Sequence, residues 1–398
     1  MSESQGEKPR HPPPREAQRL STPRLFGLVV LFLILAAYSI WNSDRFQALM
    51  QGVSEQRLSE LLQRPVHFRR VSFRIFPPQV QLADVAIAND PRIPNEPLFT
   101  ADELTIGGGI SLTGGELRLA RVRAIHPRVA LVQFPDGSWN LPPGLTGTQG
   151  KGAGLKLRVG ELVVQQGLFQ FEGRQTGING RMEGLTMEIA SLAGNRYRGL
   201  LDARKATLEL PDTEPILCSL NLRFRLDPAR GVVLEDSKMA GAFGELALSG
   251  SAEDLKRPLL LLTVSANLHV AEVERLFRSG LGFGGDARLT GQLRVPAGGG
   301  FRFAGRLSSP RIDARAFPLE GVEAELVAAP DAVIAHIVRA RYQGGEATGA
   351  LRIEGLAGPR GKALPMSLTV EGRGVSVERF FGDIKLAGTG LSGTLALS

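Results

Sequence analysis

From Val66 onward, apolar and polar residues alternate with a period of two. This period is typical of β-strands with one apolar face, because successive side chains of a strand point to opposite sides. Turn residues separate the alternating segments, as at Pro77-Pro78, Gly114-Gly115 and Asp136-Gly137. The pattern predicts a mainly β body with few short helices.

A helical pattern precedes this body. Apolar residues between Ser43 and Gln63 recur at roughly helical spacing, which predicts an amphipathic helix interrupted near Gly52 and ended before Pro65. Further upstream, Leu25–Trp41 is an uninterrupted apolar run of 17 residues, at the short end of what crosses a bilayer as a helix. Basic residues precede the run, so we expect the N-terminus in the cytoplasm and the body on the other side of the membrane.

A cleaved signal peptide is the alternative to a retained transmembrane anchor. Signal peptides have an apolar core of about 7–15 residues followed by a cleavage site of small residues. Here the run ends in Tyr-Ser-Ile-Trp-Asn-Ser-Asp. We therefore favour the anchor.

The last part of the chain carries one pattern twice. Landmarks of the first copy recur about 102 residues later, as Pro228 does at Pro330. A fixed period predicts an elongated array in which each unit buries its apolar face against its neighbours. The segments Val273–Phe277 and Val377–Phe381 predict one short helix in each copy. Because the second copy stops just after its last predicted strand, we expect the array to be unfinished at Ser398.

Two local features predict how the strands turn. Glycine recurs at a fixed place in successive strands, at Gly291, Gly305, Gly349 and Gly393, which predicts bends or bulges that would curve the sheet into a trough. The segment Gln165-Gln-Gly167 predicts a hairpin between two strands.

Composition indicates an ordered protein, since 43% of the 398 residues are hydrophobic. The net charge is +7, but the basic residues are dispersed and do not cluster with aromatic residues, which argues against a nucleic-acid partner. We expect the arginines to form a solvated outer face, with attraction to anionic lipid head groups as an alternative. The single cysteine, Cys218, is expected in the core.

No motif predicts catalysis. Two G-x-G-x-x-G matches, Gly280–Gly285 and Gly388–Gly393, follow the predicted short helices instead of opening a helix, so we interpret them as turn glycines. The five histidines are scattered singly, and the sequence has no paired cysteines, H-E-x-x-H motif or nucleophile elbow. We therefore expect a protein that is not an enzyme, with no catalytic residue, cofactor or metal.

Several segments occur in a recognisable order: Leu62-Gln-Arg-Pro-Val66, Pro78–Val85, Phe99–Leu104, Ile125–Leu131 and Asp136-Gly-Ser-Trp-Asn140. With the apolar run before them, they resemble the N-terminal region of the AsmA family of inner-membrane-anchored envelope proteins. The tandem copies resemble the C-terminal region of that family, which is similar to TamB and to eukaryotic chorein-like bridge proteins. Together the two regions cover about 330 of the 398 residues.

The resemblance implies an elongated, twisted, U-shaped antiparallel β-groove that is anchored in the inner membrane through residues 25–41 and reaches into the periplasm. Members of the family are implicated in phospholipid transport between the inner and outer membranes and in outer-membrane homeostasis, without catalysis. The implied partners are phospholipid acyl chains, the inner membrane, and outer-membrane or envelope proteins at the far end.

The expected organisation follows from these patterns. It comprises a disordered cytoplasmic tail (1–24), the anchor (25–41), an AsmA-like N-terminal β domain (43–145), a Gly-rich linker (146–154), a continuing β-groove (155–215), the first repeat copy (216–317) and the incomplete second copy (318–398).

One-sided strands agree with an apolar channel, because a curled single sheet leaves its apolar face open to acyl chains. The candidate residues that line it are Phe73, Ile75, Val80, Leu82, Leu104, Ile106, Val129, Leu131, Leu222, Phe224, Val333 and Ile337. For any one of them, an ordinary core under a helix or second sheet is the alternative.

Three functions remain open at this level. The first is a lipid-transfer conduit. The second is an assembly or scaffolding factor for outer-membrane β-barrel proteins, because an exposed sheet edge can accept a strand. The third is an envelope hydrolase, since an absence of motifs is weak grounds for excluding one.

Overall fold

The computed structural model describes residues 44–74, 76–113, 116–143, 156–193, 196–211, 213–253, 259–277, 282–296, 300–314, 317–354, 365–376 and 394–397. Contacts divide the chain into two units, Met1–Val53 and Ser54–Ser398. The predicted tail (1–24), anchor (25–41) and linker (146–154) lie outside the described residues. Of the helices that are described, none is long and apolar enough to cross a membrane.

The first described helix, α2, spans Asp44–Leu62 without a break, so the interruption predicted near Gly52 is wrong. A lone glycine costs a helix only about 1 kcal/mol, which the rest of the helix tolerates. The helix ends before Pro65 as predicted, because proline disfavours helical geometry in the residue before it. Glu55 of α2 accepts a hydrogen bond from the backbone N–H of Phe68 at 2.8 Å and so fixes the start of the β body.

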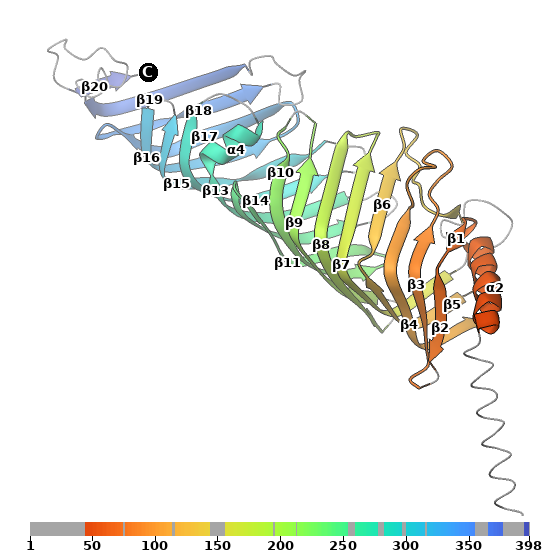
Figure 1. Ribbon diagram of the computed structural model, residues 1–398. Coiled ribbons are helices and arrows are strands. Elements are labelled where there is room, and N and C mark those ends of the chain that lie inside the picture. The colour runs from red at the N-terminus through yellow and green to blue at the C-terminus, as the bar shows by residue number, and fades with distance from the viewer. Residues whose placement is uncertain are drawn as a thin grey trace, which may run out of the picture. The chain divides into compact units, whose positions relative to one another are not determined.

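The body is mainly β, as the sequence predicts, and Figure 1 shows its strands side by side in one sheet. The strands are β1 (Val66–His67), β2 (Arg70–Arg74), β3 (Gln79–Ile87), β4 (Phe99–Thr113), β5 (Glu116–Ile125), β6 (Arg128–Gln133), β7 (Lys156–Gly173), β8 (Ile178–Leu192), β9 (Arg196–Glu209), β10 (Ile216–Asp227), β11 (Gly231–Gly241), β12 (Gly244–Glu253), β13 (Leu259–His269), β14 (Phe283–Val295), β15 (Arg302–Ala314), β16 (Phe317–Ala328), β17 (Ala332–Tyr342), β18 (Gly345–Glu354), β19 (Met366–Ser376) and β20 (Thr394–Leu397). All twenty strands in the described part of the chain belong to this sheet.

Most strands pair antiparallel with their sequence neighbours, but the sheet is mixed. β5 and β6 follow one another along the same side of β4, and β7 runs parallel to both. The prediction of an antiparallel sheet is wrong at this point. Two parallel strands start at the same end of the sheet. The chain must therefore return to that end before it forms the second strand, and such a crossover connection needs a dozen or more residues. In the sequence, 22 residues separate the end of β6 from the start of β7.

β7 is one continuous strand, so the hairpin predicted at Gln165-Gln-Gly167 is wrong. Gln166 takes a positive φ of 53° and the register with β8 shifts at this point, which makes the segment a bulge. His126, between β5 and β6, connects this bulge to β4. Its Nε2 lies 2.5 Å from Gln166 Oε1 in the bulge, and its Nδ1 lies 2.8 Å from Oδ2 of Asp102 on β4. The hydrogen bond with Gln166, and then that with Asp102, raises the pKa of His126.

The two repeat copies fold into the same order of strands, with β10–β13 in the first and β16–β19 in the second. β11 begins at Gly231 and β17 at Ala332, 101 residues later. The helix predicted at Val273–Phe277 is confirmed as α4 (Val270–Phe277). Its counterpart at Val377–Phe381 lies outside the described residues.

The recurring glycines are only partly associated with bulges. Gly291 and Gly305 are direct partners in a regular stretch between β14 and β15, so the prediction is wrong for them. A side chain added at either would lie within 2.7 Å of the Phe303 ring and within 2.5 Å of a backbone carbonyl of the partner strand, so these glycines make room for both. Gly349 does lie beside a bulge of β17, and Gly393 lies outside the described residues.

The sheet is a single layer over the described residues. Each strand makes its extensive contacts with its ladder neighbours only, and α4 adds contacts with β13 and β14. No second sheet packs on it within the described ranges. One face of the sheet is therefore not covered in the way that the core of a β-sandwich is covered.

Candidate functional site

Strand β10 shows how the two faces of the sheet differ. Its even-numbered residues from Ile216 to Phe224 are apolar or cysteine, and all are buried or half-buried. The residues between them include Ser219, Asn221 and Arg223, and most of these are exposed. Because successive side chains of a strand point to opposite sides, the even-numbered set belongs to one side of the sheet, which we call the apolar face.

The register extends this face along the whole sheet. Starting from Phe224, direct ladder partners form an unbroken line across seventeen strands, which we call row A. Every member is apolar or glycine: Phe73, Val80, Ile106, Val122, Leu162, Ile189, Gly199, Phe224, Leu234, Gly250, Leu262, Leu293, Phe303, Ala328, Val333, Ile353 and Met366. Those whose burial is described are all buried or half-buried.

A second line, row B, runs beside row A from β2 to β10. It contains Val71, Leu82, Leu104, Ala124, Val164, Met187, Leu201 and Leu222. Because Leu222 and Phe224 lie two residues apart on β10, both rows belong to the apolar face.

The remaining candidates join the same face through other residues of β10. A line of ladder partners across β7, β8 and β9 connects Leu131 to Ile216. A second such line across the same three strands connects Val129 to Cys218. Ile337 connects to Leu220 through β11 to β16. All the predicted lining residues that the structure describes thus lie on one side of the sheet, and Ile75 lies outside the described residues.

Rows A and B contain no charged residue, and their side chains are less exposed to solvent than those of the polar face. Leu234 on row A is half-buried, whereas its neighbour Val233, which points the other way, is 41% exposed. All described strands belong to one sheet, and the side chains of row A lie beside one another on adjacent strands of it. Rings shield part of the row, because Phe224 lies over Gly199 where a Cβ would overlap it.

Helix α4 covers part of the apolar face. Its Leu276 forms one buried cluster with Ala206, Cys218 and Phe243, against which Leu220 of β10 packs. The thiol of Cys218 has a raised pKa because it is buried, and the prediction that Cys218 is a core residue is confirmed. The helix therefore lies over the Cys218 side of β10, and the cluster does not include rows A and B.

α4 is attached to the sheet by a few polar contacts. Arg275 lies 2.6 Å from Glu272 of the same helix and 3.0 Å from Glu214, which precedes β10. The backbone N–H of Glu214 donates to the carbonyl of Leu276 at 2.9 Å. The contacts of the helix with β10 and the residues before it include this backbone hydrogen bond, the ion pair of Arg275 with Glu214, and the packing of Leu276 and Val273.

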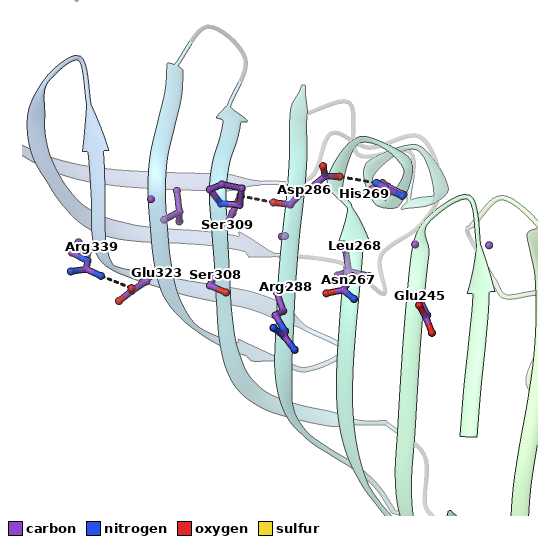
Figure 2. A pocket seen from close by; sticks show the side chains of 16 residues that line it. Glu245, Asn267, Leu268, His269, Asp286, Arg288, Ser308, Ser309, Glu323 and Arg339 are labelled. Atoms are coloured by element: carbon purple, nitrogen blue, oxygen red, sulfur yellow. Dashed lines mark hydrogen bonds and ion pairs between the residues drawn. The ribbon is translucent and has the colours of Figure 1, made fainter. Parts of the chain in front are cut away.

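The opposite face is polar and contains a hollow of about 670 Å³, which Figure 2 shows. Six of its residues are consecutive ladder partners, one on each strand from β12 to β17: Glu245, Asn267, Arg288, Ser308, Glu323 and Arg339. Charged residues that line the hollow pair with one another: Arg339 lies 2.5 Å from Glu323, and His269, which also lines it, lies 2.7 Å from Asp286. We interpret this hollow as a solvated outer surface.

A second hollow of about 440 Å³ lies near β6–β9 and includes the predicted residue Leu131. Phe171, the ladder partner of Leu131, also lines it, together with Glu96, Glu172 and Glu209. Trp139 lies beside Phe171, with their ring centroids 5.8 Å apart. This hollow mixes apolar and acidic groups, and row A does not contribute to it.

A buried polar cluster holds the N-terminal end of the sheet together, and sequence reasoning did not identify it as such. Arg64, between α2 and β1, donates to Asp90 Oδ2 at 2.8 Å and to the carbonyl of Asn89 at 3.0 Å. Arg92 holds the same carboxylate and stacks over Phe134 at 3.4 Å from the ring centroid. The hydrogen bond from Arg92, aided by Arg64, lowers the pKa of Asp90 despite its burial.

Asn140 completes this cluster. It is fully buried, donates to Asn89 Oδ1 and to the carbonyl of Ala130 at 2.8 Å each, and accepts from the N–H of Val132 at 2.9 Å. Arg64 and Asn140 belong to the two motif segments, Leu62–Val66 and Asp136–Asn140, that carry the family resemblance. In this fold those residues tie three segments together, which is a structural role.

The geometry suits binding of an apolar ligand. Within the described residues, no group of histidine, cysteine, aspartate and glutamate side chains is arranged to hold a metal ion. No family model, no curated protein and no solved structure matches the chain.

Proposed function

We propose that the protein is a non-enzymatic lipid-transport protein whose apolar face holds phospholipid acyl chains. The observation that carries the proposal is row A, an unbroken line of apolar residues and glycines across seventeen strands in a single-layered sheet. At about 4.8 Å per strand, such a line is on the order of 80 Å long.

Energetics support an acyl chain as the occupant. Apolar area removed from water contributes roughly 25 cal/mol per Å², so an uncovered face of this length has a strong tendency to acquire an apolar partner. Rows A and B have no charge that an acyl chain would have to desolvate. In this proposal the sheet curls into an elongated U-shaped groove with the apolar face inside, which accounts for the low exposure of row A.

The cellular setting is part of the proposal. Residues 25–41 anchor the protein in the inner membrane, the body lies in the periplasm, and the groove contributes to phospholipid transport between the inner and outer membranes. The resemblance to the AsmA family and the apolar run Leu25–Trp41 support this setting.

Site-specific photocrosslinking in cells that express the full chain tests the proposal. A benzophenone amino acid is placed at Phe224 on row A or at Arg225, the next residue on the polar face. We expect phospholipid adducts, detected by mass spectrometry, at Phe224 and few or none at Arg225. Equal labelling at both positions, or no lipid at Phe224, would overturn the proposal.

A second candidate is a scaffold for outer-membrane β-barrel assembly, and the edge of β19 favours it. Among the described residues, β20 pairs only with Gly372–Ser376 of β19, which leaves the outer edge of Met366–Glu371 without a described strand partner. An open edge can accept a strand from another protein. Crosslinks from Thr369 to a barrel precursor, with no lipid adduct at Phe224, would favour this candidate.

A further inference from the structure

We propose that the turn between β2 and β3 docks on the surface of a lipid bilayer that contains anionic head groups. The turn lies between Arg74 and Gln79 and carries Phe76. Phe76 is 89% exposed, the largest exposed fraction among the large apolar side chains of the described residues. A single exposed apolar side chain is common on protein surfaces, so the proposal depends on how the turn presents this ring and on the charges beside it.

The backbone holds Phe76 outward. Pro77 and Pro78 follow it and are also exposed, and their rings restrict the conformations by which the turn could fold back. The carbonyl of Pro78 accepts a hydrogen bond from the N–H of Gly108 at 3.0 Å, which fixes the base of the turn to β4. No ring contact of Phe76 occurs within the described part of the chain. The ring is therefore presented at the end of a supported turn.

The charge beside the turn matches an anionic surface. Arg70 and Arg74 lie on the same side of β2, are exposed, and form no ion pair with any described carboxylate. Of the carboxylates on the adjoining strands, Asp84 pairs with Arg69, and Glu103, in line with Arg70 two strands away, accepts a hydrogen bond from Thr105 at 2.9 Å. Each basic residue near an anionic membrane surface contributes about 1 kcal/mol of attraction.

A bilayer fits this feature better than a protein partner does. Stable protein interfaces bury about 800 Å² on each side and centre on a packed cluster, whereas this turn offers one ring at a convex tip. A membrane interface accepts a single aromatic ring flanked by basic residues. The inference does not depend on acyl chains binding to the apolar face.

A fluorescent label at position 76 of the full chain tests docking. Cys218→Ala removes the native thiol, and Phe76→Cys or, as a matched control in the exposed β10–β11 turn, Ala229→Cys accepts an environment-sensitive dye. The protein is reconstituted in vesicles of phosphatidylcholine, with or without phosphatidylglycerol. A lipid-borne quencher and aqueous iodide then report whether the dye lies in lipid or in water.

With phosphatidylglycerol present, we expect the dye at position 76 to be quenched from the lipid and shielded from iodide, and the dye at position 229 to show the reverse. Arg70→Gln and Arg74→Gln should each weaken docking about fivefold, equivalent to about 1 kcal/mol. Iodide access at position 76 equal to that at position 229 would overturn the proposal. Lipid quenching unchanged without phosphatidylglycerol would overturn its anionic part.

Discussion

At the scale of single residues, the apolar face depends on glycines that aromatic rings cover. Phe224 lies over Gly199 of the adjacent strand, and Phe303 lies over Gly291 and Gly305. The tip of a ring that lies over a glycine fills the space that the missing side chain leaves and keeps the row apolar. Gly199, Gly291 and Gly305 are therefore packing positions.

We predict that Gly199→Ala destabilises the sheet by roughly 1–3 kcal/mol, because the new Cβ would displace the Phe224 ring. Gly180→Ala on the neighbouring strand is the matched control, since an added Cβ there contacts nothing within 4 Å. Urea unfolding followed by circular dichroism measures both variants. Equal free energies of unfolding would contradict the role assigned to the ring.

A buried charge also acts at this scale. Asp90→Asn breaks the ion pair with Arg64, whose exposed fraction is 8%, and should lower the free energy of unfolding by about 3 kcal/mol at neutral pH. The folded pKa of Asp90 is lowered, so this contribution is present above the unfolded pKa of about 3.9 and is lost as the pH falls below it.

The difference between wild type and Asp90→Asn should therefore shrink below about pH 4. Denaturant unfolding across a pH series, followed by the fluorescence of nearby Trp139, measures it. Asp84→Asn is the control, because its pair with Arg69 is largely exposed and contributes little. A difference that persists unchanged at low pH would show that the Asp90 carboxylate is not the stabilising group.

At the scale of elements, α4 packs on the apolar face, and Cys218 lies beneath it. Its exposed ion pair with Glu214 contributes little energy. Detachment of the helix is therefore an accessible local opening. It would uncover Cys218 together with the part of the face that Leu276 covers.

We predict that Glu214→Gln speeds the alkylation of Cys218 in the native protein roughly threefold, since the loss of a surface pair shifts the opening equilibrium by about 0.7 kcal/mol. Glu272→Gln is the control, because it removes only the ion pair of Arg275 within α4. A maleimide reagent and mass spectrometry give the rates. Equal rates in both variants would contradict attachment through Glu214.

At the scale of the whole molecule, row A is continuous across the sheet, so a charge in its middle should interrupt it. We predict that Leu234→Glu removes most of the phospholipid that co-purifies with the full chain, since a buried carboxylate costs several kcal/mol. Val233→Glu places the same charge on the polar face, where Val233 is already 41% exposed, and should leave bound lipid unchanged. Lipid mass spectrometry after matched purification compares them; equal loss in both would argue against row A as the binding surface.

The alternation of residues by itself determined that the body is β and which side chains share a face. This worked because alternation is local: once a segment is extended, each side chain's direction follows from its neighbours. For the same reason the short helix at Val273–Phe277 was predictable from its own residues.

Only the tertiary structure decided how the segments meet. The parallel pairing of β7, the bulge at Gln166 and the position of α4 over Cys218 depend on partners far away in sequence, and so does the burial of Asp90 between Arg64 and Arg92. Register is a relation between strands, and an extra residue in one strand changes its partners without changing its composition. The sequence thus determined the apolar face of each strand, and the register joined those faces into one continuous row.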